Sequence, residues 1–132
     1  METKTGKNNK VILVVEDDDI SFYLLQEILS SIEMKAVRAK SKDDVLKLVE
    51  NEKDFDVIIM DLILNGSENG FNIAKELNIL NINIPVMIVS AYANYYADAD
   101  KRNLQNVREV MYKPFNIDNF KSLLLKTIQS SE

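Results

Sequence analysis

The sequence predicts an α/β domain in which a doubly wound, five-stranded parallel sheet is covered by helices on both faces. Short apolar runs, rich in β-branched residues, alternate along the chain with stretches whose apolar residues recur at helical spacing. Apolar runs without polar alternation are typical of strands that are buried on both faces, as in parallel sheets. A length of 132 residues with 46% hydrophobic residues suits one domain with one sizeable core.

Five short segments are predicted to be strands. In chain order they are Val11–Val15, Lys35–Ala39, residues 56–60, residues 84–89 and Val107–Tyr112. For doubly wound sheets of this size one common order is the flavodoxin-like 2-1-3-4-5, which places the first and third strands side by side. We therefore expect that order here.

A helix is predicted after each strand, because apolar residues recur there three and four positions apart. The residues that define four of these helices are Leu24, Leu25, Ile28, Leu29 and Ile32; Val45, Leu48 and Val49; Phe71, Ala74 and Leu77; and Phe120, Leu123, Leu124 and Ile128. A weaker, more polar helix is predicted over residues 92–105. The expected capping residues are Asp18 or Asp19, Ser41 with Asp44, and Asn116 or Asp118.

Composition excludes several kinds of chemistry. The chain has no cysteine and no histidine, so thiolate nucleophiles, disulfides, Cys-ligated zinc and the commonest general base are all absent. A net charge of −5 without a basic run argues against direct nucleic-acid binding. No apolar stretch is long enough for a membrane span. We expect a cytoplasmic chain with a flexible tail over residues 1–9, one domain over residues 10–132 and no output domain.

Polar side chains gather at the predicted carboxyl ends of the strands. Glu16 and Asp17 end the first strand, Asp61 ends the third, and Ser90 and Lys113 follow the fourth and fifth. In an open parallel sheet these ends share one edge, where ligands bind. Carboxylates gathered there require a positive partner, and a hard divalent cation is the simplest one. Taken singly, the first acidic group could equally be a helix cap and the serine an ordinary turn hydroxyl.

Four short strings in this order carry a resemblance to a known family. They are VVEDD at residues 14–18, IMDL at 59–62, VSAY at 89–92 and YKPF at 112–115. Together they resemble the receiver domain of two-component response regulators, from about residue 10 to the end. The resemblance implies a signalling phospho-acceptor that works in a phosphorelay, rather than an enzyme acting on other substrates.

The resemblance assigns a role to each of these residues. Asp61 would accept a phosphoryl group from the phosphohistidine of a sensor histidine kinase or a histidine phosphotransfer protein. Mg²⁺ would be held by Glu16, Asp17, Asp61 and the backbone carbonyl of Ile63. Because the chain has no histidine, it can receive this group but cannot be the histidine donor.

The remaining implied roles concern the phosphoryl group after transfer. Lys113 would pair with its charge, Ser90 would hydrogen-bond one of its oxygens, and a cis peptide before Pro114 would aim the lysine inward. Position 110 often carries an aromatic switch residue in the family, and here it is Val110. The switch is therefore expected to be absent or differently built.

Apolar residues in excess of what the core needs are expected to form a face for partners. On the first and fourth helices they are Ile20, Phe22, Tyr23, Tyr92 and Tyr95. The first three would dock a kinase, and the tyrosines would respond to Ser90. The chain would be a monomer, or a dimer that depends on phosphorylation.

Two other functions suit the same fold. A phosphorylation-independent interaction module would keep the sheet without the chemistry, but the whole set of site residues is present. A Mg²⁺-dependent phosphohydrolase with Asp61 as nucleophile would need a second carboxylate two residues on, and that position is Ile63.

Overall fold

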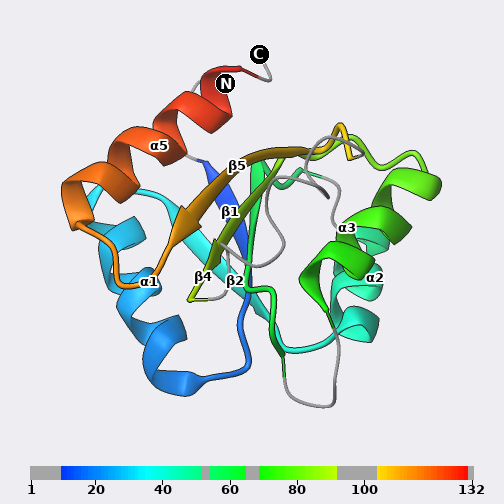
Figure 1. The fold of residues 1–132 in the computed structure, drawn as a ribbon, viewed down its shortest axis with the longest axis horizontal. Helices are drawn as coiled ribbons and strands as arrows, with labels where there is room; N and C mark the ends of the chain where they lie inside the picture. Colours follow the sequence, from blue (N-terminus) through cyan, green and yellow to red (C-terminus); the bar gives the residue numbers. More distant parts are fainter. Residues whose placement is uncertain (1–9, 52–53, 65–68, 92–103, 131–132) are drawn as a thin grey trace.

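The computed structural model describes residues 10–51, 54–64, 69–91 and 104–130, which form a parallel sheet flanked by helices (Figure 1). Its strands are β1 Val11–Val15, β2 Lys35–Ala39, β3 Val57–Met60, β4 Val86–Ser90 and β5 Val107–Tyr112. All neighbouring strands are parallel, and the order is β2-β1-β3-β4-β5. The predicted fold class and strand order are therefore confirmed.

The described helices lie on both faces of this sheet. They are α1 Asp19–Ser31, α2 Lys42–Asn51, α3 Gly70–Ile79 and α5 Ile117–Gln129. Figure 1 shows α1 and α5 on one side of the sheet and α2 and α3 on the other. Among the described helices, none has the length and apolar character needed to cross a membrane. The predicted tail over residues 1–9 and nearly all of the helix predicted over residues 92–105 lie outside the described residues.

Three strand boundaries differ from the prediction. β3 begins at Val57 and not one residue earlier, and the carboxylate of Asp56 accepts a hydrogen bond from the backbone N–H of Val11 at 2.8 Å. β4 begins at Val86 and not at residue 84. β4 runs to Ser90, so that this serine belongs to the strand and is fully buried. The later end of β4 matters for the site, because the hydrogen bonds of the sheet then fix the position of Ser90.

The helix starts follow the capping signals in the sequence. Asp18 caps α1 by accepting a hydrogen bond from the backbone N–H of Ser21 at 2.8 Å, and Asn116 caps α5 in the same way. At α2, the hydroxyl of Ser41 accepts a hydrogen bond from the N–H of Asp44 at 3.2 Å. Of the alternatives that the sequence left open, Asp18 and Asn116 are therefore the caps.

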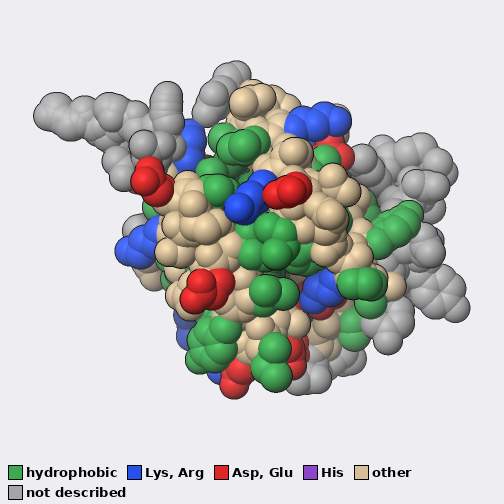
Figure 2. All heavy atoms as spheres, turned by 90° about the vertical axis from the view of Figure 1, so that its left-hand side faces the viewer, with side chains coloured by type: hydrophobic (Ala, Val, Ile, Leu, Met, Phe, Trp, Pro, Cys, Tyr) green, Lys and Arg blue, Asp and Glu red, His purple; other side chains and the backbone are tan. Residues whose placement is uncertain are grey.

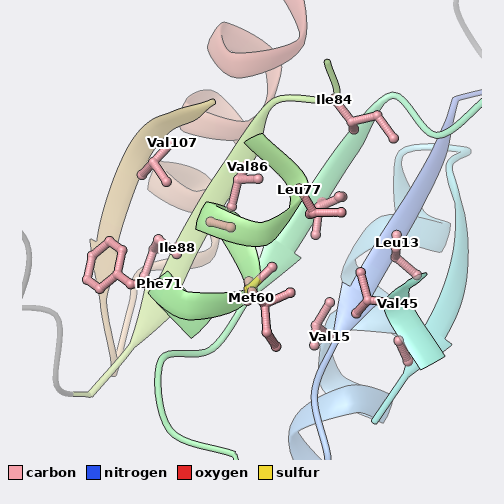
Figure 3. Close-up of a cluster of buried hydrophobic side chains, with 14 of the residues drawn as sticks. Leu13, Val15, Val45, Met60, Phe71, Leu77, Ile84, Val86, Ile88 and Val107 are labelled. Carbon is pink, nitrogen blue, oxygen red and sulfur yellow. The ribbon is translucent and has the colours of Figure 1, made fainter. Parts of the chain in front are cut away.

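The core consists of two apolar clusters, one on each face of the sheet. Leu13 and Val15 belong to the cluster beneath α2 and α3 (Figure 3), whereas Ile12 and Val14 belong to the cluster beneath α1 and α5. Alternate residues of one strand thus reach opposite faces. Because both faces are covered, β1 has to be apolar throughout, as the sequence pattern indicated.

The prediction that Phe22 belongs to the partner face is wrong. Phe22 is only 5% exposed and packs in the cluster beneath α1 and α5. It lies three residues before Leu25 and seven before Leu29, which places all three on the buried side of α1. Leu24, which we counted in the buried stripe, is instead 50% exposed. The apolar stripe of α1 is thus rotated by about one residue from the expected one.

Candidate functional site

Strand register brings the predicted site residues to one edge of the sheet. Val15 of β1 pairs with Met60 of β3. The residues that follow them, Glu16 and Asp61, therefore emerge side by side. At the other end of the edge, the N–H of Lys113 donates a hydrogen bond to the carbonyl of Ser90 at 3.1 Å. The carboxyl ends of β1, β3, β4 and β5 therefore supply the polar groups of a single site.

Lys113 lies at the centre of this site. Its Nζ is 3.2 Å from Oε1 of Glu16 and 3.3 Å from Oδ2 of Asp61. The side chains of Glu16, Asp61 and Lys113 are 4%, 14% and 23% exposed, so the three charges are largely screened from water by the protein. The positive partner that the carboxylates require is thus the ammonium group of this lysine.

The pKa values of the buried pair reflect this arrangement. Burial raises the pKa of the Glu16 carboxyl, and the opposing effects of the Lys113 charge and of the Asp18 N–H do not cancel it. Burial also acts to lower the pKa of Lys113, but the charges of Asp61 and Glu16 outweigh it and raise that pKa above the usual 10.5. Lys113 therefore stays charged at neutral pH, while Glu16 is protonated more easily than an exposed glutamate.

The backbone around Asp61 is tightly packed. The N–H of Asp61 donates to the carbonyl of Val15 at 3.3 Å, and its Oδ1 accepts from the N–H of Ile63 at 3.3 Å. A Cβ atom on Gly70, the first residue of α3, would lie 2.3 Å from the carbonyl oxygen of Asp61. Only glycine allows α3 to begin this close to the predicted acceptor.

The other predicted ligands lie on the loops that follow β1 and β3. Asp17 is partly buried in the loop between β1 and α1. Ile63 forms an isolated antiparallel bridge with Asn69, and its side chain is 44% exposed. The peptide bond before Pro114 is cis, as predicted. The structure thus brings Glu16, Asp61 and Lys113 into direct contact, and Asp17, Ile63 and Pro114 lie within two residues of them along the chain.

The predicted magnesium ligands are carboxylate and carbonyl oxygens, which are the donors that Mg²⁺ prefers. Among the described residues, no three acidic side chains converge as a ready-made metal site. Glu16 and Asp61 nevertheless share one cation, because the Lys113 ammonium bridges them. Mg²⁺ commonly binds through one or two carboxylates and keeps several of its waters, and all the predicted ligands are oxygen atoms. The residues therefore fit a magnesium ion that would be a second positive partner of the carboxylates beside the ammonium.

The face that carries α1 and α5 exposes apolar side chains, interspersed with charged ones (Figure 2). A cavity of about 410 Å³ opens there between α1 and the loop after β5, and Lys113 is one of its lining residues. Leu24 and Ile117 border it and are 50% and 47% exposed. Ile20 and Tyr23, predicted as partner residues, are 81% and 57% exposed on the same helix. The sequence interpretation missed Leu24 and Ile117 as members of this surface.

The other predicted partner residues have different outcomes. Val110 is half-buried and packs against the cluster beneath α2 and α3. Tyr92 and Tyr95 lie outside the described residues. Of this group, only Val110 can therefore be located, on the strand that leads to Lys113.

One residue that contacts the acidic loop was missed entirely. The Nε of Arg38 donates a hydrogen bond to the carbonyl of Glu16 at 2.9 Å, and its Nη1 lies 2.9 Å from Oδ1 of Asp19. Arg38 pairs with Val14 in the sheet, on the strand next to the loop. The signal in the sequence was a charged residue near the end of the second strand. The pairing of Arg38 with Val14 was needed to show that this residue lies beside the loop that follows β1.

Comparison with known proteins places this site in a family. The transcriptional regulatory protein ZraR of Escherichia coli (strain K12) is 29% identical over 121 residues, which are 92% of the chain. The chain spans only 27% of the length of that protein. Sporulation initiation phosphotransferase F of Bacillus subtilis (strain 168) is 26% identical over 118 residues, which are 89% of the chain and 93% of that protein.

Solved structures agree with the sequence comparison. The response regulator protein TrrA of Thermotoga maritima, solved in complex with Mg²⁺ and BeF, superposes with a TM-score of 0.78 at 26% identity. The match covers 89% of this chain and 98% of that one. The family model of the response regulator receiver domain matches residues 12–125, and the chain therefore belongs to this family.

Proposed function

We propose that Asp61 accepts a phosphoryl group from the phosphohistidine of a sensor histidine kinase or phosphotransfer protein, and that the receiver then changes its partner contacts. The observation that carries this proposal is the bridge from Lys113 to both Glu16 and Asp61 at 3.2 and 3.3 Å. It joins two carboxylates and one ammonium group in a single hydrogen-bonded group, which supports the roles of acceptor, metal ligand and charge partner proposed for them. The complex of TrrA with Mg²⁺ and BeF supports the same use of the site.

The transfer requires little covalent chemistry from the protein. An oxygen of the Asp61 carboxylate forms a bond to phosphorus as the bond from phosphorus to the imidazole nitrogen of the partner breaks. This transition state is loose, so that catalysis depends on positioning and on neutralising charge. Bound Mg²⁺ would supply part of that neutralisation, held by Glu16, Asp17, Asp61 and the carbonyl of Ile63.

The other site residues then act on the transferred group. Lys113 exchanges its contact with Asp61 for a phosphoryl oxygen, because that oxygen carries more negative charge than the carboxylate does. The hydroxyl of Ser90, fixed at the end of β4, donates a hydrogen bond to a second oxygen. These roles are supported by the position of Ser90 at the end of β4 and by the hydrogen bond from the backbone N–H of Lys113 to the Ser90 carbonyl.

The apolar surface beside the site suits the docking of the phosphohistidine partner. The cavity between α1 and the loop after β5 adjoins Lys113, and Ile20, Tyr23 and Leu24 extend its apolar character along α1. Burial of such an exposed apolar surface by a partner favours the association of two proteins. We propose that the donor binds here, in the cytoplasm, with its phosphohistidine directed at Asp61.

Intact mass spectrometry after incubation with Mg²⁺ and acetyl phosphate tests the proposal. The protein should gain one phosphoryl group, Asp61→Asn should gain none, and omission of Mg²⁺ should prevent the gain. Asp56→Asn is the matched control, because this aspartate precedes β3, at the end opposite to Asp61, and its carboxylate interacts with the N–H of Val11 and with Lys10. A phosphoryl group that forms on Asp61→Asn would refute the assignment.

The phosphohydrolase alternative has a weaker basis. It needs an acid two residues after the nucleophile, and Ile63 at that position is a hydrocarbon side chain that is 44% exposed.

A further inference from the structure

Arg38 reaches the acidic loop from the neighbouring strand. It belongs to β2 and lies on the sheet face that α1 covers, where its guanidinium carbon is 4.9 Å from the centre of the Phe22 ring. A guanidinium over an aromatic face is held in place by the charge distribution of the ring. The side chain is 16% exposed, so that its position is fixed by packing as well as by polar contacts.

The two polar contacts of Arg38 bracket the loop between β1 and α1. Its Nε holds the carbonyl of Glu16, where the loop begins, and its Nη1 holds the carboxylate of Asp19, where α1 begins, both at 2.9 Å. The N–H of Glu16 is held by the carbonyl of Ala39, also in β2, at 3.0 Å. The backbone of Glu16 is therefore fixed on both sides by β2, and this determines where Asp17 emerges.

A guanidinium is well suited to make both contacts at once. Its N–H groups form a rigid planar fork, whereas the ammonium of a lysine is a single point charge. The Nη2 of Arg38 is buried and has no hydrogen-bond partner among the described residues. Burying that group without a partner costs free energy, so the contacts of Nε with Glu16 and of Nη1 with Asp19 must hold the guanidinium in place.

We propose that Arg38 is a positioning residue, which holds residues 16–19 in their metal-binding shape and thereby strengthens the binding of Mg²⁺. The inference rests on the proposed function, because it assumes that Glu16 and Asp17 are ligands. Arg38 itself touches neither the metal nor the phosphoryl group in this role. Outer residues that orient metal ligands typically change metal affinity by about 10-fold to 100-fold.

The sign of the effect distinguishes positioning from simple electrostatics. A positive charge beside a cation site weakens cation binding, so that removing it would by itself tighten the binding of Mg²⁺. Positioning predicts the opposite, namely weaker binding. It also predicts that lysine fails to replace Arg38, although lysine keeps the charge.

The experiment measures the Kd for Mg²⁺ from amide chemical shifts during titration with MgCl₂, for the wild type, Arg38→Ala, Arg38→Lys and Arg108→Ala. The Kd should rise about 10-fold in both Arg38 variants. Arg108→Ala should bind as the wild type does, because this arginine also donates to a backbone carbonyl, that of Gln105 at 3.0 Å, but is exposed on β5. The midpoint of metal-free unfolding is measured in parallel for each protein.

Four results would overturn the inference. Tighter binding in Arg38→Ala with unchanged binding in Arg38→Lys would show an effect of charge alone. A lower unfolding midpoint with an unchanged Kd would show a purely structural role. If the alanine variant does not fold, Arg38→Lys decides, and a Kd equal to that of the wild type refutes positioning. Failure of the wild type itself to bind Mg²⁺ would overturn the proposed function as well, so the two failures are distinguishable.

Discussion

Replacing Lys113 with methionine tests how the charges of the site are balanced. Methionine has a similar length and no charge, so the substitution removes the ammonium while largely preserving packing. The carboxylates of Glu16 and Asp61 would then face one another without their common partner. Because Glu16 is 4% exposed, it cannot recover this loss by hydration.

The size of the effect follows from the two contacts. Hydrogen bonds to charged groups contribute about 1.5 to 3 kcal/mol each. The variant also avoids the cost of burying an ammonium, which offsets much of that sum. Lys113 is 23% exposed, so solvent screens its charge in part. We therefore expect Lys113→Met to lower the free energy of unfolding by roughly 2 kcal/mol at about pH 8.

This loss should depend on pH through Glu16. The folded-state pKa of Glu16 is already raised above 4.5 by burial, and removing Lys113 raises it further. A carboxyl whose pKa is raised on folding contributes stability that is present below the unfolded pKa and lost as the pH rises through the folded pKa. The deficit of the variant should therefore be smaller at about pH 5 than at about pH 8, because the raised pKa of Glu16 favours its protonation at the lower pH. Lys113 in the wild type stays charged throughout this window.

The assay is urea unfolding followed by far-ultraviolet circular dichroism at both pH values, with free energies from linear extrapolation. Lys113→Arg is the control that keeps the charge, and its deficit should not vary with pH in this way. Equal deficits of Lys113→Met at the two pH values would show that the lysine stabilises the fold through packing, and the electrostatic reasoning would be refuted.

Four further substitutions test other parts of the structure. Gly70→Ala places a Cβ 2.3 Å from the carbonyl oxygen of Asp61. It should therefore lower the free energy of unfolding by about 1 to 3 kcal/mol and slow phosphorylation by acetyl phosphate. A wild-type stability in urea and a wild-type rate would contradict this close contact. Asn116→Ala removes the cap of α5 and should cost about 1 kcal/mol in the same unfolding assay, whereas an unchanged midpoint would mean that the cap contributes nothing. On α1, Tyr23→Ala should change stability by less than about 0.5 kcal/mol but slow transfer from a phosphohistidine protein, with no effect on acetyl phosphate. Its buried neighbour provides the contrast, since Phe22→Ala should cost about 3 to 5 kcal/mol, and the reverse pattern would show that the two side chains are assigned to the wrong sides of the helix.

The sheet was predictable because its signals are local. Apolar runs such as Val11–Val15 can be satisfied only by burial on both faces, and alternation with helices then restricts the strands to parallel pairing. Once the order is fixed, Glu16 and Asp61 must lie together. Their link to Lys113, 97 residues after Glu16 in the chain, follows from the same topology.

What the sequence could not provide depends on rotation and register. The apolar residues of α1 cover more than one side of the helix, so the spacing alone could not decide that Phe22 faces the core and Leu24 faces solvent. Arg38 was missed for a related reason. Its role requires that β2 pair with β1 so that Arg38 lies opposite Val14, and a shift by one residue would turn its side chain to the other face.

The charge of the site explains why it needs both Lys113 and hydrogen-bond donors that carry no charge. Glu16, Asp17 and Asp61 carry three negative charges and Lys113 one positive charge, so a divalent cation brings the sum to zero. Phosphorylation replaces one carboxylate charge by a group of about −1.5 to −2, which leaves up to one negative charge unbalanced. A second lysine would neutralise this charge permanently and weaken the metal site before transfer. Under the proposed function, neutral donors such as the Ser90 hydroxyl and the N–H of Ile63 would instead stabilise the added charge without opposing the metal. The excess charge would then exist only in the phosphorylated protein, and this is what a switch requires.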